Sequence, residues 1–138
     1  MKRWLKIGLV LTALVCAAVC VVWFVHLQSE RAAARQRELR YESDLHSYAG
    51  VIVPGMSRDP VEHYLRIHRV HFQRVYNFDG NGTDADLTKI GQEPAPWYCS
   101  EQNVYISFQF RSADGFESVD PSDKLQKITI YRWLQDCL

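Results

Sequence analysis

The chain has 138 residues, an apolar content of 47% and a formal net charge of zero at pH 7, a length that suits one ordinary globular domain. The neutral total hides an asymmetry, because Lys2, Arg3 and Lys6 precede a long uncharged segment while all 16 acidic residues follow it, against 13 basic ones. The part beyond that segment is therefore slightly acidic. This balance argues against a dedicated nucleic-acid binder, which neutralises phosphates with excess Lys and Arg.

The uncharged segment covers residues 7–25. About 20 apolar residues cross a bilayer core as a helix, whereas the apolar region of a secretory signal is usually about 7 to 15 residues long. We therefore predict a short tail (1–6) and a retained transmembrane helix (7–25) that anchors the chain in a lipid bilayer. Trp4 and Trp23 lie near its two ends, where indole rings favour the membrane interface.

The orientation of this helix is weakly encoded, because basic residues flank it on both sides. Three precede it, and four arginines follow it at positions 31, 35, 37 and 40. A very short basic tail directly before the span is typical of a signal anchor. We predict a cytoplasmic N-terminus and an extracytoplasmic C-terminal domain, which would be periplasmic in a diderm bacterium.

Residues 26–50 are predicted to form a helical stalk. The stretch 29–48 lacks Gly and Pro and is rich in Ala, Arg, Glu and Leu, which favour helices. Leu39, Leu45 and Tyr48 give it a sparse apolar face. The pattern suits either a solvated stalk or a helix packed lightly on the following domain.

A second helix is predicted from about Arg58 to Arg69, at the start of a domain that covers residues 51–138. Ser57 is a good N-cap residue, and the Asp59-Pro60 pair suits a first helical turn. Positions on one face of a helix then follow at Val61, Tyr64, Leu65 and His68, with the spacing i, i+3, i+4 and i+7.

The remaining sequence changes to the two-residue period of strands. Predicted strands cover 72–78, 87–92, 103–110 and 125–132, and residues 79–86 are dense in turn formers. The sequence thus predicts an α+β domain with one or two helices packed on an antiparallel sheet of three or four strands.

The last two strands alternate so regularly that they predict their own register. An antiparallel pairing that places Ile106 opposite Ile130 and Phe108 opposite Ile128 also matches the polar residues between them. A slip of one residue would set apolar against polar side chains along the whole ladder. We expect Val61 and Leu65 of the second helix to cover this apolar face, together forming the core.

The same register places Cys99 opposite Cys137. Cysteines facing each other across two strands are close enough for a disulfide, and neither has the Cys-x-x-Cys partner or neighbouring base that a reactive thiol requires. We therefore predict a structural disulfide between them. Such a bond requires an oxidising compartment, which agrees with the predicted orientation.

Metal, cofactor and catalytic sites are not predicted. His63, His68 and His71 are close in sequence, but 63 and 68 lie about 140° apart around a helix, and no supporting Cys or carboxylate set is evident. Cys16 and Cys20 within the apolar span are expected to be ordinary apolar thiols. The prediction is that the chain is not an enzyme.

Two loops could carry other functions. Residues 79–90 resemble a calcium-binding loop at their first oxygen positions, but Asp84 and Ile90 replace its required Gly and Glu, which favours a plain turn. Asn81 begins an Asn-Gly-Thr glycosylation acceptor, relevant in a host with that machinery. The acidic loop 112–123 carries Phe116, a candidate contact residue.

One short stretch resembles a known family. The sequence VPGMSRDPVEHYL resembles the opening helix of the SmpA/OmlA (BamE-like) family of outer-membrane assembly lipoproteins, which has a Gly-Met-Ser/Thr turn before a helix with buried Val and Leu. The matching positions are Gly55, Met56, Ser57, Val61 and Leu65. The resemblance implies a domain of two helices on a three-stranded antiparallel sheet. This chain differs by having an apolar span where the family has a lipobox cysteine.

Together these features predict a non-enzymatic, single-span envelope protein whose small domain binds another envelope protein. The sequence specifies no small-molecule ligand. A filament subunit resembling type IV pilins is the alternative, because pilins also join an apolar N-terminal helix to a sheet with a C-terminal disulfide. Pilins carry a glutamate near the start of the apolar segment, and residues 7–25 contain none. An enzyme with an unrecognised site is the third interpretation.

Overall fold

The computed structural model describes residues 2–111 and 120–138, with side chains from residue 11 onward. The described chain forms two compact units, residues 1–39 and 40–138. Helix α1 (Lys2–Ala49) supplies the first unit and the beginning of the second.

The first unit is helical and strongly apolar. Among the described residues, one helix is long and apolar enough to cross a membrane, with a mean hydropathy of 2.1 in its most apolar window. Its large apolar side chains, including Leu14, Val22 and Phe24, are more than half exposed, so no other part of the described chain buries them. Cys16 and Cys20 are likewise exposed, free thiols.

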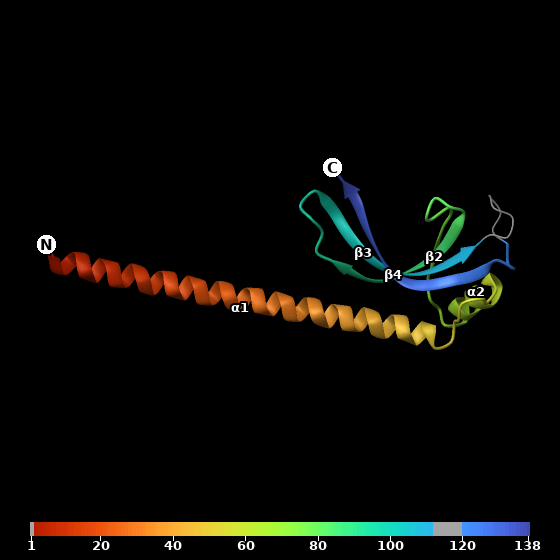
Figure 1. Cartoon of the computed structure of the whole chain (residues 1–138), viewed down its shortest axis with the longest axis horizontal. Coiled ribbons are helices and arrows are strands. Elements are labelled where there is room, and N and C mark those ends of the chain that lie inside the picture. Colours follow the sequence, from red (N-terminus) through yellow and green to blue (C-terminus); the bar gives the residue numbers. More distant parts are fainter. Residues whose placement is uncertain (1, 112–119) are drawn as a thin grey trace. The chain divides into compact units, whose positions relative to one another are not determined.

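The second unit combines helices with one antiparallel sheet, which confirms the predicted α+β class. The strand order is β1-β2-β3-β4, so each strand lies beside its neighbour in sequence (Figure 1). Its elements after α1 are α2 (Arg58–Ile67), β1 (Gln73–Val75), β2 (Thr83–Glu93), β3 (Cys99–Arg111) and β4 (Lys124–Cys137).

The register predicted for the last two strands is confirmed. Ile106 pairs with Ile130 and Phe108 with Ile128, in an antiparallel ladder that continues to the cysteines. A bulge shifts the register between Gln109 and Phe110, beyond the apolar pairs on which the prediction rested.

The disulfide between Cys99 and Cys137 closes the far end of this ladder, as predicted, and the two Cα atoms are 4.0 Å apart. It links β3 to β4 beside the loop 94–98, which joins β2 to β3.

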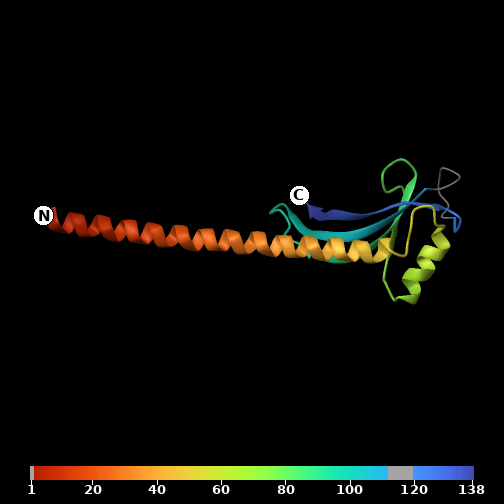
Figure 2. The ribbon, with the colours of Figure 1, turned by 60° about the horizontal axis from the view of Figure 1, so that its bottom comes forward.

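The main core lies between the sheet and the two helices. In Figure 2, α2 and the last turns of α1 lie on the same side of the sheet. The fully buried core residues include four of the predicted ones, while Ile128 packs against them and Ile130 is half-buried on the edge strand. The four are Val61, Leu65, Ile106 and Phe108.

The last ten residues of α1, which were predicted to be part of the stalk, belong to the sheet unit. Leu45 and Tyr48 pack against the core, and the Tyr48 ring meets Phe108 edge-on at 5.5 Å. Tyr41 is 3% exposed and lies on Gly91, where an added Cβ would be 2.6 Å from the Tyr41 hydroxyl oxygen. A side chain at residue 91 would have to displace the Tyr41 ring, so glycine allows this helix to approach β2 closely.

Candidate functional site

Arg58, at the first turn of α2, is the centre of a cluster of charged side chains. The helix begins there because Pro60 suits a first turn and the preceding Ser57 has extended backbone. The backbone N–H of Arg58 donates to the Asp123 carbonyl (2.8 Å), and that of Asp59 to the Pro121 carbonyl (3.1 Å). Loop carbonyls thus satisfy helix donors that an N-cap side chain usually satisfies.

Ser57 occupies the predicted N-cap position, but its hydroxyl acts differently from the prediction. Ser57 Oγ accepts a hydrogen bond from Lys124 Nζ at 2.8 Å, rather than one from the helix backbone. The residues before α2 also pair with the start of β4, because Gly55 N donates to Leu125 O and Leu125 N donates to Met56 O. The helix start is therefore fixed to the sheet by backbone hydrogen bonds.

The Arg58 guanidinium is buried among carboxylates. The residue is 1% exposed, and its nitrogen atoms lie 3.5 Å from oxygen atoms of three aspartates, at positions 84, 86 and 123. Its Cζ atom also lies 4.3 Å from the centre of the Phe110 ring, within the range of a cation–π contact. The group therefore joins α2, β2, β3 and the segment before β4.

A second arginine extends this cluster toward β1. Arg74 pairs through Nε with Asp86 Oδ1 at 3.4 Å and through Nη2 with Glu62. Glu62, on α2, also accepts from Arg66 Nη1 at 3.1 Å. We call Arg58, Arg74, Glu62 and the three aspartates at 84, 86 and 123 the Arg58 cluster.

Burial dominates the titration of Asp86. It raises the pKa of this fully buried carboxyl to about 6, although Arg58 and Arg74 oppose the shift. Asp86 is therefore ionised at neutral pH, with one arginine on each side. Burial alone would lower the pKa of Arg74. The carboxylates of Glu62 and Asp86, which both pair with Arg74, outweigh this effect, so its pKa is raised.

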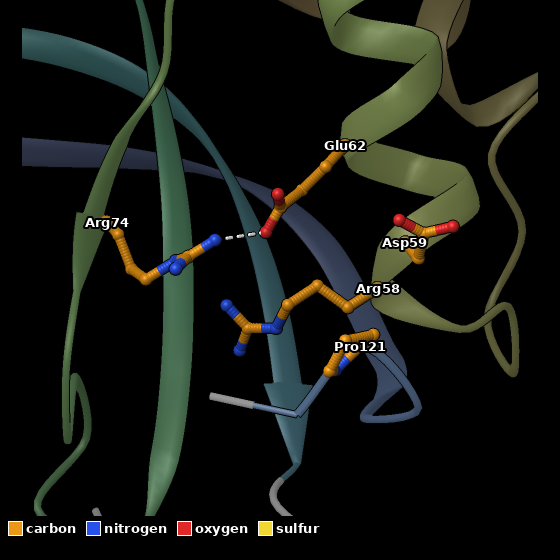
Figure 3. Close-up of a pocket in the computed structure, with 5 residues that line it drawn as sticks. All are labelled: Arg58, Asp59, Glu62, Arg74 and Pro121. Carbon is orange, nitrogen blue, oxygen red and sulfur yellow. Dashed lines mark hydrogen bonds and ion pairs between the residues drawn. The ribbon is translucent and has the colours of Figure 1, made fainter. Parts of the chain in front are cut away.

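A pocket of about 170 Å³ adjoins the cluster and is lined by Arg58, Asp59, Glu62, Arg74 and Pro121 (Figure 3). Ligand pockets are usually about 300 to 1,000 Å³ and mostly apolar. The charged groups of this pocket mainly pair with one another, as the dashed contact between Arg74 and Glu62 in Figure 3 illustrates. Chemically, the arrangement suits a structural connection between α2 and the sheet.

This cluster was not predicted from the sequence. Residues 79–86 were expected to form a turn, but β2 already begins at Thr83, so Asp84 and Asp86 lie in a strand. Both carboxylates face Arg58, which compensates for their poor strand propensity. The available signal was the alternation of acidic residues at 84 and 86, which places both on one face of a strand.

The turn covers residues 76–82 rather than 79–86. The strand predicted over 72–78 was therefore too long, because β1 ends at Val75. Asp79 accepts hydrogen bonds from Asn81 N (2.9 Å), Thr83 N (3.2 Å) and Thr83 Oγ1 (2.8 Å). These bonds lower the pKa of Asp79. The loop's own donors thus engage the carboxylate that a calcium ion would need.

The three histidines that are close in sequence have different surroundings in the structure. His68 stacks on Tyr64 with ring centres 4.2 Å apart, while His63 and His71 are exposed. Within residues 2–111 and 120–138, no group of three or more His, Cys, Asp or Glu side chains is arranged to hold a metal ion. Phe116 lies outside the described residues.

A second candidate site is the sheet face opposite α2. Ala85, Leu87 and Tyr105 form a small buried cluster there, and aromatic side chains surround it. Phe78 meets Tyr131 edge-on at 4.6 Å, while Trp133 lies 6.2 Å from Tyr105 and 6.3 Å from Tyr131. Figure 2 shows the loop that carries Phe78 rising on the opposite side of the sheet from α2.

The β4 edge is next to this aromatic face. Backbone bonds from Gly55 and Met56 occupy the edge at Leu125. From Lys127 to Cys137, β4 pairs with β3 on one side, while Gln126 is the extra residue at the bulge. No strand in the described part of the chain pairs with the other side of β4. Unpaired N–H and C=O groups on such an edge can accept another strand.

Comparisons with known proteins add no relative: no family model matches the chain, and neither the curated proteins nor the solved structures give a match.

Proposed function

We propose that this chain is a membrane-anchored envelope protein with a single transmembrane span, whose α+β domain is a non-catalytic module that binds another envelope protein. The domain would lie outside the cytoplasm, with the N-terminus inside. The observation that carries the binding role is the open edge of β4 beside the aromatic sheet face.

Anchoring is supported by the side chains of the first unit. Residues such as Leu14, Val22 and Phe24 are 61–69% exposed, which is costly in water and favourable in lipid. The Cys99–Cys137 disulfide supports an oxidising location for the domain, and hence a cytoplasmic N-terminus.

Binding along β4 is supported by its length and its chemistry. Twelve residues, 126–137, follow the part of the edge occupied by Gly55 and Met56. An extended segment of a partner could add main-chain hydrogen bonds there, while its alternate side chains meet Tyr131 and Trp133 on one face. Strand addition of this kind uses a preformed edge and needs no rearrangement of the core.

Site-directed photocrosslinking in the native membrane would test this proposal. A photoreactive residue replacing exposed Lys127 or Leu134 on β4 is expected to capture one specific envelope protein. The same substitution at His63, exposed on α2, is the matched control and should capture none. Equal capture from all three positions, or from none, would refute binding along this edge.

The same experiment separates the filament alternative from the binding module. A filament subunit would give ladders of its own copies from the β4 positions, rather than one distinct partner.

Orientation has a separate test, because a reporter active only after export should work when fused to Leu138. Activity from a cytoplasmic reporter alone at that position would reverse the assignment.

A further inference from the structure

The end of the sheet near the disulfide carries an exposed apolar group. Trp97 is 91% exposed and Tyr98 is 40% exposed, in the loop between β2 and β3, and Leu138 is fully exposed next to them. We call these three residues the aromatic tip. An indole ring this exposed leaves a large apolar surface in water, so the tip is a candidate contact surface.

The aromatic tip is held in place by several bonds. The disulfide joins the residues that follow Tyr98 and precede Leu138, and the Leu138 N–H donates to the Tyr98 carbonyl at 2.8 Å. The Cys99 N–H donates to the Pro96 carbonyl at 2.9 Å, and the rings of Trp97 and Tyr98 meet edge-on at 5.8 Å. A preformed surface loses little conformational freedom when it binds.

The chain enters the domain at this same end. Within the sheet unit, Tyr48 lies against Phe108 and Tyr41, seven residues earlier, lies on Gly91. Gly91 pairs with Val104, which is nearer than Phe108 to the tip end of β3. From Tyr48 to Tyr41, α1 therefore runs from the middle of the sheet toward the tip end of β3.

The segment between the apolar span and the domain is short. Residues 26–39 separate Val25 from the first residue of the sheet unit. The sheet unit is therefore tethered to the apolar span by fourteen residues.

Lipid suits the chemistry of the tip and its surroundings. Trp and Tyr rings favour the membrane interface, where one part of the ring is apolar and another can donate a hydrogen bond. Arginines at 31, 35, 37 and 40 would draw this segment toward anionic headgroups. Because the anchor keeps the domain beside the bilayer, contact with lipid is effectively intramolecular.

We propose that the aromatic tip inserts into the interfacial layer of the membrane that anchors the chain, so that the domain lies against the bilayer. This inference rests on the proposed membrane anchoring. It assigns the surface that faces lipid, and it leaves the β4 edge accessible to a protein partner.

Depth-dependent quenching of Trp97 would test the inference in the full chain. The three other tryptophans, at 4, 23 and 133, are replaced by Phe, and the protein is reconstituted in vesicles of phosphatidylcholine and phosphatidylglycerol. We expect brominated phosphatidylcholine to reduce the emission of Trp97 at least twofold, with little quenching by aqueous acrylamide. A matched control has Tyr76→Trp with all four natural tryptophans changed to Phe, because residue 76 is 61% exposed in the turn after β1. In this control, acrylamide should quench the emission strongly and brominated lipid should have little effect.

A second measurement avoids the triple replacement in case Trp133→Phe disturbs the fold. Trp97→Phe alone is compared with the parent chain, so that the difference between their emission spectra is the emission of Trp97. Brominated lipid should reduce this difference. Full acrylamide quenching of Trp97, or protection without bromine quenching, would overturn the inference, the latter by showing that protein covers the tip.

Alkaline extraction and the emission of Trp23 distinguish the two proposals. If the chain stays in the vesicles and bromine quenches Trp23 but not Trp97, anchoring stands and the tip inference fails. If the chain is extracted and neither residue is quenched, the anchoring proposal fails as well.

Discussion

Replacing Arg58 with Met tests whether the Arg58 cluster holds α2 on the sheet. The Met side chain keeps much of the aliphatic length and can still contact Phe110, but it removes the buried positive charge. The aspartates at 84, 86 and 123, each 3.5 Å from the guanidinium in the parent, would then lack their shared partner. We expect Arg58→Met to lower the free energy of unfolding at pH 7 by about 3 to 5 kcal/mol.

The pH dependence gives this prediction a distinctive sign. The pKa of Asp86 is about 6 in the folded protein against its ordinary value of 3.8, so its contribution to stability is present below pH 3.8 and is lost as the pH rises through about 6. Without Arg58, the pKa of Asp86 in the folded protein rises further. Each unit of this rise corresponds to about 1.4 kcal/mol of unfolding free energy. The loss of unfolding free energy caused by Arg58→Met should therefore be at least about 1 kcal/mol smaller at pH 5 than at pH 7.

Urea unfolding of the full chain in detergent micelles, followed by the emission of Trp133 in the sheet, measures both quantities. Arg66→Met is the matched control, because Arg66 is 55% exposed and pairs with Glu62 on the helix surface. It should cost less than about 1 kcal/mol at either pH. Equal losses for the two variants, or a loss at Arg58 independent of pH, would refute a structural role for the buried charge.

Three further predictions concern other parts of the domain. Gly91→Ala should lower stability by about 1 to 3 kcal/mol because its Cβ would strike the Tyr41 ring, and in a Tyr41→Ala background the same change should have nearly no effect in urea unfolding. Cys137→Ser should lower the free energy of unfolding by about 2 to 4 kcal/mol relative to the oxidised parent chain, and the two chains should be equally stable once the parent disulfide is reduced. Cys16→Ser should leave the unfolding midpoint unchanged. Asp86→Asn should remove the loss of stability that the parent shows between about pH 4 and pH 6, measured as the slope of unfolding free energy against pH.

The sheet register could be predicted because one alternating pattern determines it. The pairs Ile106 with Ile130 and Phe108 with Ile128 leave a single apolar face, and any slip by one residue would expose it. The disulfide followed from that register without separate evidence. Predictions of this kind succeed when local periodicity and long-range pairing depend on the same residues.

The Arg58 cluster could not be predicted in the same way, because its members share no sequence pattern. Arg58 meets residues 28 and 65 positions later, and Asp84 and Asp86 carry low strand propensity on their own. Their strand forms because tertiary charge pairing outweighs local preference. The packing of Tyr41 on Gly91 was missed for a related reason, since a glycine in a strand signals a close approach without identifying what approaches it.

The two ends of the sheet are stabilised by different chemistry, and this bears on how the domain could bind a partner. The Arg58 cluster and the backbone bonds at Leu125 hold one end, while the disulfide holds the other, beside the aromatic tip. The free part of the β4 edge extends between them, so this strand is held to the rest of the domain at both of its ends. A partner strand would therefore meet a preformed edge and bind largely as a rigid body, without the cost of ordering it. Reduction should weaken binding at the edge and at the tip together, because Cys137 is the end of β4 and also supports Leu138. Loss of the Arg58 charge should act at the opposite end and leave the tip unchanged, so comparing the two perturbations separates the two proposed contact surfaces.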